Sequence, residues 1–188
     1  MSVSESGFSL LEVLIAMAIS SVLLLGAARF LPALQRDIFQ QTRKLALEDD
    51  MWQRMYTVAK HLQRAGYCHG SCSGEGIYIS DTGRCIIVQW DANANGVWEN
   101  EPGKEAEQTG FRLNDSVLET QRGAKTCNGK GWDKITDPDV VQITAFEVVR
   151  QDIAGFAPEL TLHLRGVSRG GDPQTVADAR YSVSGFNL

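Results

Sequence analysis

The sequence has few histidines, few cysteines and no excess of basic residues. Its 188 residues include three histidines, which leaves few candidates for catalytic bases or metal ligands. The formal net charge is −5 and the pI is about 5.2, so no nucleic-acid partner is expected. Apolar residues make up 43% of the chain and charged residues 22%, which excludes a wholly disordered chain and a polytopic membrane protein. The length predicts one domain with an appendage.

Long apolar runs are absent after residue 29, and the single one lies near the N-terminus. Residues 8–28 (FSLLEVLIAMAISSVLLLGAA) contain one charged residue, Glu12. A helix of that length spans about 30 Å, the thickness of a hydrocarbon core. The run is too long for a cleaved secretory signal, and no lysine or arginine precedes it. We therefore predict one transmembrane helix, in which the glutamate costs about 2.5–3.5 kcal/mol unless it has a partner.

Residues 7–12 (GFSLLE) resemble the processing site of type IV pilins and type II secretion pseudopilins. In that family a short polar leader ends in glycine, phenylalanine follows, and a glutamate stands fifth from the new N-terminus. The resemblance implies that prepilin peptidase cleaves after Gly7 and that the Phe8 amine is methylated. It also implies that Glu12 attracts the Phe8 amine of a neighbouring subunit during assembly. Opposite charges attract strongly where the dielectric is low, which supports such a pair.

The charges around the apolar run depart from the family pattern. The leader carries Glu5 in place of the usual base, and Arg29, Arg36, Arg43 and Lys44 follow the run. The positive-inside rule alone would place the soluble part in the cytoplasm. The cysteines and the family's processing on the cytoplasmic face indicate the opposite. We therefore expect a single-pass protein of the bacterial inner membrane with its C-terminal domain in the periplasm, a topology that depends on the resemblance.

Beyond the membrane the helix is expected to continue to Gly66, a residue that favours a helix end. Pro32 removes one helical hydrogen bond and is a candidate kink. Apolar residues at helical spacing predict one contact face: Ile38, Leu45, Trp52, Met55, Ala59 and Leu62. This face is complete only in its second half. Residues 50–65 should therefore pack on the globular part, and residues 33–48 should lie in a more polar setting.

The rest of the chain is predicted to form strands and loops. Candidate strands cover residues 77–80, 85–90, 111–113, 117–122, 140–150, 159–167 and 179–184. No helix-length pattern separates them, so the sheet should be mostly antiparallel. The predicted fold is α+β and pilin-like, with a long N-terminal helix packed on this sheet. The segments are a leader (1–7), a transmembrane helix (8–29), its amphipathic continuation (30–66) and a periplasmic β-rich domain (67–188).

Four cysteines, Cys68, Cys72, Cys85 and Cys127, all lie in the part expected to be exported. An even number in an oxidising compartment predicts two disulfides, and three connectivities are open. A zinc site with four thiolates is the alternative. It is disfavoured because the cysteines lack the double C-x-x-C spacing.

Residues 91–99 (DANANGVWE) have the pattern of the first part of an EF-hand calcium loop, with a glycine at its sixth position. The candidate ligands are Asp91, Asn93, Asn95, the Val97 carbonyl and Glu99. The twelfth position is Pro102 rather than a bidentate glutamate, and Glu101 or Glu105 would have to replace it. The alternative is an Asn-Gly turn in a hairpin between Trp90 and Trp98. Both interpretations stay open, and they are compatible.

No catalytic pattern stands out. His61 lies in the expected helix, His163 lies in a strand, and no serine or cysteine has a recognisable triad context. The chain is therefore not expected to be an enzyme, and calcium is the one cofactor that stays open.

Residues 62–68 (LQRAGYC) and the loop from Trp90 to Trp98 narrow the resemblance to J-type minor pilins and the prepilin peptidase-dependent protein B family. The resemblance implies a structural subunit that helps to initiate a type IV pilus or a type II secretion pseudopilus and stays near its tip. Implied partners are other minor and major pilins or pseudopilins, prepilin peptidase and inner-membrane lipid. The main alternative is a membrane-anchored periplasmic binding module, adhesin-like and calcium-dependent. A tethered periplasmic enzyme is the third hypothesis.

Overall fold

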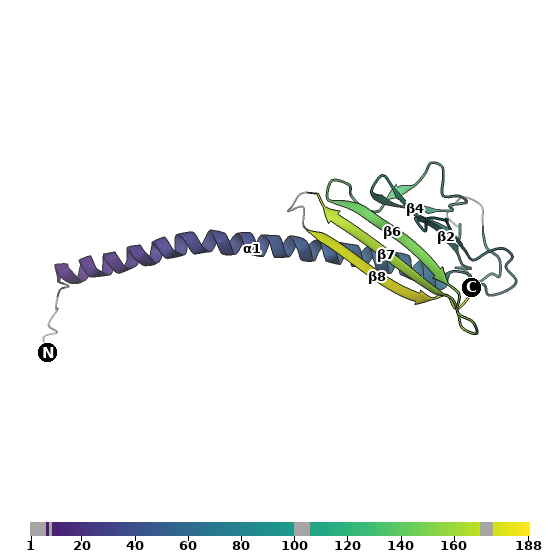
Figure 1. Ribbon diagram of the computed structural model, residues 1–188, viewed down its shortest axis with the longest axis horizontal. Coiled ribbons are helices and arrows are strands. Elements are labelled where there is room, and N and C mark those ends of the chain that lie inside the picture. The colour runs from purple at the N-terminus through teal and green to yellow at the C-terminus, as the bar shows by residue number, and fades with distance from the viewer. Residues whose placement is uncertain (1–6, 8, 100–105, 170–174) are drawn as a thin grey trace. The chain divides into compact units, whose positions relative to one another are not determined.

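The computed structural model describes residues 7, 9–99, 106–169 and 175–188 (Figure 1). The chain divides into two compact units, Met1–Arg43 and Lys44–Leu188. One helix, α1 (Leu10–Arg64), contributes residues to both units and continues through Pro32. Two antiparallel sheets complete the second unit. The predicted α+β class is thus confirmed.

The first part of α1 is exposed along its whole described length. Every residue from Ser9 to Ala46 is exposed, although this stretch includes the most apolar run of the sequence. A helix that is apolar all round is stable only when lipid or other helices surround it. The sequence of this segment is therefore suited to surroundings that the single chain does not supply.

The second part of α1 has one buried face. Its buried residues recur every three or four positions: Leu47, Met51, Met55, Val58, Ala59 and Leu62. The predicted packing of residues 50–65 is confirmed. Ile38 and Leu45 are exposed, as expected for a segment that was not predicted to pack on the globular part. The buried face begins at Leu47, slightly before the predicted start at residue 50, and Trp52 is only half-buried.

Gly66 ends the helix, as predicted. Its φ is +82°, a left-handed conformation that glycine adopts without strain. Its N–H donates to the Gln89 carbonyl at 2.9 Å, which ties the helix end to β2. A Cβ at this position would also collide with the Asn187 carbonyl. Both the backbone conformation and the close approach therefore require glycine.

The strands form two sheets rather than the single sheet that we expected. The first has the order β1 (Ile77–Ile79), β2 (Cys85–Gln89), β3 (Gln108–Asn114), β4 (Val117–Arg122) and β5 (Asp133–Lys134). The second has the order β6 (Val141–Gln151), β7 (Glu159–Ser168) and β8 (Val176–Ser184). All neighbours are antiparallel. The two-residue strand β5 was missed because it is too short to show an alternating pattern.

The second sheet buries alternate residues of β7. Leu160, Leu162 and Leu164 are buried, as their alternation predicted. In β6 the buried positions change from Val141 and Ile143 to Phe146 and Val148. The register shifts between Ile143 and Ala145, where a β-bulge inserts an extra residue. Because of this shift, the apolar side chains before and after the bulge all point into the core.

We predict that Leu62→Ala destabilises the globular unit by about 2–5 kcal/mol, because Leu62 is 0% exposed in the contact between helix and sheet. Leu45→Ala is the matched control in the same helix, since Leu45 is 65% exposed. Its effect should stay within about 0.5 kcal/mol. All four tryptophans lie in the second unit, so denaturant unfolding followed by tryptophan fluorescence measures this difference. Equal losses would contradict the described packing.

Candidate functional site

The acidic residue of the N-terminal motif caps its own helix. The Ser9 N–H donates to Glu12 Oε2 at 3.0 Å. The N–H groups of Glu12 and Val13 donate to the Ser9 carbonyl at 3.0 and 3.2 Å. This is one half of a capping box, in which a glutamate three residues into the helix binds the N–H of the capping residue. Partial positive charge at the helix N-terminus also favours a carboxylate there.

The predicted processing site is only partly described. Gly7 is exposed, and no atom lies within 4 Å of the position that a Cβ would take. The backbone is therefore accessible at the residue after which cleavage is expected. Phe8 lies outside the described residues, as do residues 1–6 of the predicted leader. Cleavage after Gly7 and methylation of Phe8 remain predictions.

Helix α1 is long and apolar enough to cross a membrane, and none of its most apolar window is buried. The core helix of a soluble protein is mostly buried, which distinguishes it from this segment. The division of the chain after Arg43 falls inside the predicted amphipathic segment 30–66. The predicted bounds of the transmembrane helix, residues 8–29, remain a prediction.

The second candidate site is the loop that follows β2. Asp91 is buried, and its carboxylate accepts N–H groups of His69, Asn95 and Gly96 at 3.0, 3.0 and 2.9 Å. Burial of this carboxylate raises its pKa, but the backbone hydrogen bonds outweigh burial and hold the pKa below the ordinary value of 3.8. Asp91 is therefore ionised at neutral pH and organises the loop around it.

The two asparagines of the loop form consecutive turns. Asn93 Oδ1 accepts the N–H of Asn95, and Asn95 Oδ1 accepts the N–H of Val97, both at 2.9 Å. Their amide nitrogens donate to the carboxylate of Glu99. The hydrogen bond from Asn95 contributes most to lowering the pKa of Glu99. The alternating polar side chains of the loop thus converge. Their oxygens, however, already accept hydrogen bonds from N–H groups of the same loop.

Glu107 is a loop residue that the sequence pattern missed. It is buried, and its Oε1 accepts the N–H groups of Ala92 and Asn93 at 2.6 and 3.2 Å. Its Oε2 accepts the N–H of Glu99 at 3.3 Å. Burial and the adjacent Glu99 carboxyl both raise the pKa of Glu107. Glu107 lies beyond the nine-residue motif, so no spacing rule identified it.

These contacts change the hairpin interpretation. Strand β2 ends at Gln89 and β3 begins at Gln108, so Trp98 lies in the connection and not in a strand. Its Nε1–H donates to the Tyr67 carbonyl at 3.0 Å. The Asn95-Gly96 turn exists, with φ of +83° at Gly96. The turn lies in the connection of the antiparallel pair β2 and β3, so the predicted hairpin is present, but its connection spans residues 90–107 and is longer than a turn between Trp90 and Trp98.

Calcium binding stays a prediction. Asp91, Asn93, Asn95, Val97 and Glu99 lie in one loop. The substitutes considered for the twelfth position, Glu101 and Glu105, lie outside the described residues with Pro102. A cation at this loop would use oxygens of Asp91 and Glu99.

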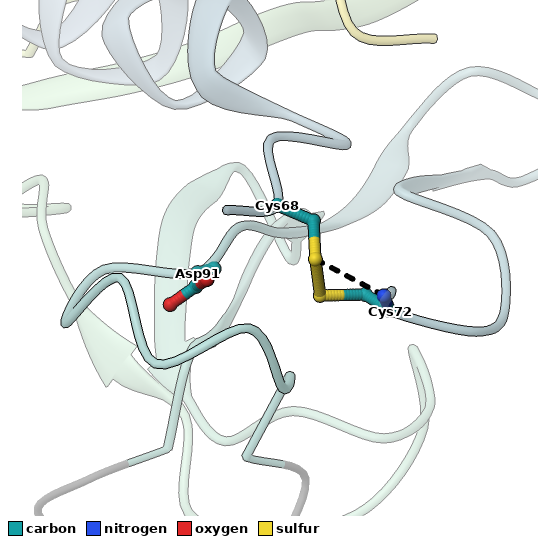
Figure 2. Close-up of side chains that lie close together, drawn as sticks. All are labelled: Cys68, Cys72 and Asp91. Carbon is teal, nitrogen blue, oxygen red and sulfur yellow. Dashed lines mark hydrogen bonds between the residues drawn. A yellow bond between two sulfur atoms is a disulfide. The ribbon is translucent and has the colours of Figure 1, made fainter. Parts of the chain in front are cut away.

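The cysteines form two disulfides, Cys68–Cys72 and Cys85–Cys127. Their sulfurs are therefore not available as the thiolates of a zinc site. Figure 2 shows Asp91 beside the first bridge, and one oxygen of Asp91 lies within 4.8 Å of both sulfurs. The second bridge joins the start of β2 to the segment before β5. The Cys127 carbonyl there accepts Arg112 Nη1–H at 2.7 Å.

The histidines lie in structural contacts. The ring of His61 packs edge-on against the rings of Trp90 and Phe111, with centroids 4.9 and 5.0 Å away. Burial, with a smaller effect of Arg64, lowers the pKa of His61 to about 4, so His61 is neutral at pH 7. His163 Nε2 pairs with Asp178 at 3.0 Å across β7 and β8.

Comparisons with known proteins identify two matching families. The model of "Prepilin peptidase-dependent protein B" matches residues 40–185. The model of the "Prokaryotic N-terminal methylation motif" matches residues 3–28. The chain is also 67% identical over 188 residues to "Prepilin peptidase-dependent protein B" of Escherichia coli (strain K12), and the match covers 100% of both chains. No solved structure matches.

The two disulfides should contribute unequally to stability. They close loops with sequence separations of 4 and 42 residues. The entropy model then predicts a loss of about 2 kcal/mol for Cys68→Ser with Cys72→Ser and about 4 kcal/mol for Cys85→Ser with Cys127→Ser. Urea unfolding of each double variant measures both values. A larger loss for the Cys68–Cys72 pair would show that this bridge does more than close a short loop.

Calcium titration tests the loop after β2. We predict a Kd of about 10⁻⁴–10⁻³ M, because only Asp91 and Glu99 are charged members of the candidate set. Glu99→Gln keeps the side-chain volume and removes one charge, so it should weaken binding at least about tenfold. Glu75→Gln is the control, since it changes an exposed acid outside the loop. If calorimetry with the unchanged chain detects no binding at about 5 mM calcium, the loop is a hydrogen-bonded turn only.

Proposed function

The chain belongs to the prepilin peptidase-dependent protein B family of type IV pilin-like proteins, and from this we propose that it is a minor pilin or pseudopilin. In this proposal it helps to initiate assembly of a type IV pilus or a type II secretion pseudopilus and stays near the tip. Its partners are other pilin-like subunits, prepilin peptidase and inner-membrane lipid. Its role is structural rather than catalytic.

The observation that carries this proposal is the unpartnered apolar part of α1. All residues from Ser9 to Ala46 are exposed in the single chain. Exposed apolar surface is favourable only in lipid or against other helices. Residence in the membrane followed by transfer into a filament supplies both surroundings in turn. In a soluble receptor domain this apolar surface would be exposed to water, which is unfavourable.

Glu12 has a function in each of the two states. In the separate subunit its carboxylate accepts the Ser9 N–H, which reduces the cost of placing it in an apolar segment. Cleavage after Gly7 leaves Ser9 and Glu12 in the chain and creates a charged amine at Phe8. A neighbouring subunit can then offer Glu12 an oppositely charged partner, whereas the Ser9 N–H carries no net charge. Opposite charges attract strongly where the dielectric is low, so assembly is favoured.

The proposed orientation places the second unit in the periplasm. All four cysteines of the chain form disulfides there, and disulfides persist in oxidising compartments. The arginines after the apolar run favour the opposite orientation by the positive-inside rule. We give the disulfides more weight. The positive-inside rule describes a statistical bias in membrane insertion, whereas the reducing cytoplasm would break the disulfides.

We predict that Glu12→Gln abolishes the chain's contribution to filament assembly while protein level and N-terminal cleavage stay normal. Glutamine keeps a hydrogen-bond acceptor for Ser9 but cannot form the ion pair. Asp49→Asn is the matched control, because Asp49 is an exposed acid of the same helix. Electron microscopy of pili or an assay of secretion gives the readout, and mass spectrometry should show a methylated Phe8 at the N-terminus.

Two results would contradict this proposal. Normal assembly in a strain that lacks the chain altogether would favour the membrane-anchored binding module. An intact N-terminus, with residues 1–7 still attached in membrane-purified protein, would remove the processing on which the proposed pairing of Glu12 depends.

A further inference from the structure

Three arginines follow the apolar run of α1 at a constant interval. Arg29, Arg36 and Arg43 are each seven residues apart and lie in the first compact unit. Seven residues make almost two helical turns and advance the axis by about 10.5 Å. The three side chains therefore lie along one face of α1, and we call this set the arginine row.

The first two members of the arginine row have no acidic neighbour on the helix. Residues three and four positions away are the ones that a helical side chain can reach. For Arg29 and Arg36 these positions hold Leu25, Gly26, Pro32, Ala33, Phe39 and Gln40. Both arginines are exposed, and they make no hydrogen bond or ion pair with any residue that the structure describes. Arg43 interacts with another residue of the chain. Arg29 and Arg36 are therefore the two members of the row whose charges are available to a partner.

A lipid surface does not fit the arginine row. If the apolar run crosses the bilayer as proposed, Arg29 lies where the hydrocarbon ends, and Arg36 lies about 10.5 Å further along the helix. The headgroup layer on each side of a bilayer is only about 5–8 Å thick. The backbone of Arg36 therefore lies beyond the headgroup layer, and its side chain would have to extend back toward the membrane to reach a headgroup. A second helix that runs beside α1 can reach both.

A second copy of this chain does not fit either. Two arginines seven residues apart require two carboxylates at a similar interval on the facing helix. The acids of α1 are Glu12, Asp37, Glu48, Asp49 and Asp50, and no two of them are seven residues apart. Asp37 is next to Arg36 in sequence, so it faces a different direction from the arginine row.

We propose that Arg29 and Arg36 of the arginine row bind carboxylates on the N-terminal helix of a different pilin-like subunit, spaced about two helical turns apart. This inference rests on the proposed function, because it assumes that α1 lies beside other subunits. Two pairs at a fixed interval specify the axial position of one helix against the other. A slip by one helical turn, about 5.4 Å, would separate both arginines from their partners.

Site-specific photocrosslinking in cells tests this proposal. Ala33 is exposed and lies four residues after Arg29 and three before Arg36, so it is on the face of the arginine row. Ala33→p-benzoylphenylalanine is introduced into the full chain, and the crosslinked peptide is identified by mass spectrometry. The expected adduct joins the N-terminal helix of another pilin-like subunit at a segment that contains aspartate or glutamate.

Charge variants then decide whether the arginines cause the contact. Arg29→Glu with Arg36→Glu should lower the adduct yield at least about fivefold, because attraction becomes repulsion. Arg29→Lys with Arg36→Lys should retain most of it. Lys60→Glu with Lys134→Glu is the matched control, since it reverses two exposed cations of the second unit. Replacing the partner's acids by lysine should restore the adduct to the reversed variant.

Three outcomes would overturn the proposal: an adduct with lipid, an adduct with a second copy of this chain, or a yield unchanged by charge reversal at equal membrane levels of protein. Arg29→Gln with Arg36→Gln removes the charge without adding acids, so it replaces the reversed variant if that variant inserts poorly. Assembly is scored in the same strains. Normal assembly without the chain refutes the proposed function, whereas a charge-independent adduct in an assembly-competent strain refutes only this inference.

Discussion

The structure depends on one helix that has to satisfy two different surroundings. Over residues 47–62 of α1 a single face is buried against the sheets, and the energy of that contact is available within the chain. Over residues 9–46 every residue is exposed among the residues that the structure describes. Hydrogen bonds inside the helix hold the backbone in both parts, but the apolar side chains of the first part would be stabilised by lipid or by other helices. The globular unit is therefore stabilised by contacts within the chain, whereas the apolar side chains in the first part of the helix are not.

The sequence predicts α1 and its end at Gly66 well, because a long apolar run and a glycine are strong local signals. It also predicts that the helix packs on the globular part from residue 50 onward, and it misses only the slightly earlier start of the buried face at Leu47. The single expected sheet became two because pairing between strands is a long-range property. The bulge near Thr144 also interrupts the alternation from which strands are recognised.

The two candidate sites differ in how much the sequence reveals. The motif around Glu12 is compact, and together with the short leader and the apolar run of residues 8–28 it indicates the class of protein. The loop at Asp91 depends on Glu107, which joins it only after β3 pairs with β2. The disulfide pairing likewise follows from the fold, since three connectivities fit the sequence equally. Local motifs thus identify the N-terminal site, and only tertiary structure completes the loop.

The bridge between Cys85 and Cys127 has a mechanical consequence. When a polypeptide is pulled along its length, a covalent crosslink carries force past the segment that it encloses. Tension that runs along the backbone outside residues 85–127 passes from sulfur to sulfur and not through the backbone of β3 and β4 (Gln108–Arg122). The strands that hold the loop at Asp91 are therefore protected from being unravelled when the chain is under tension.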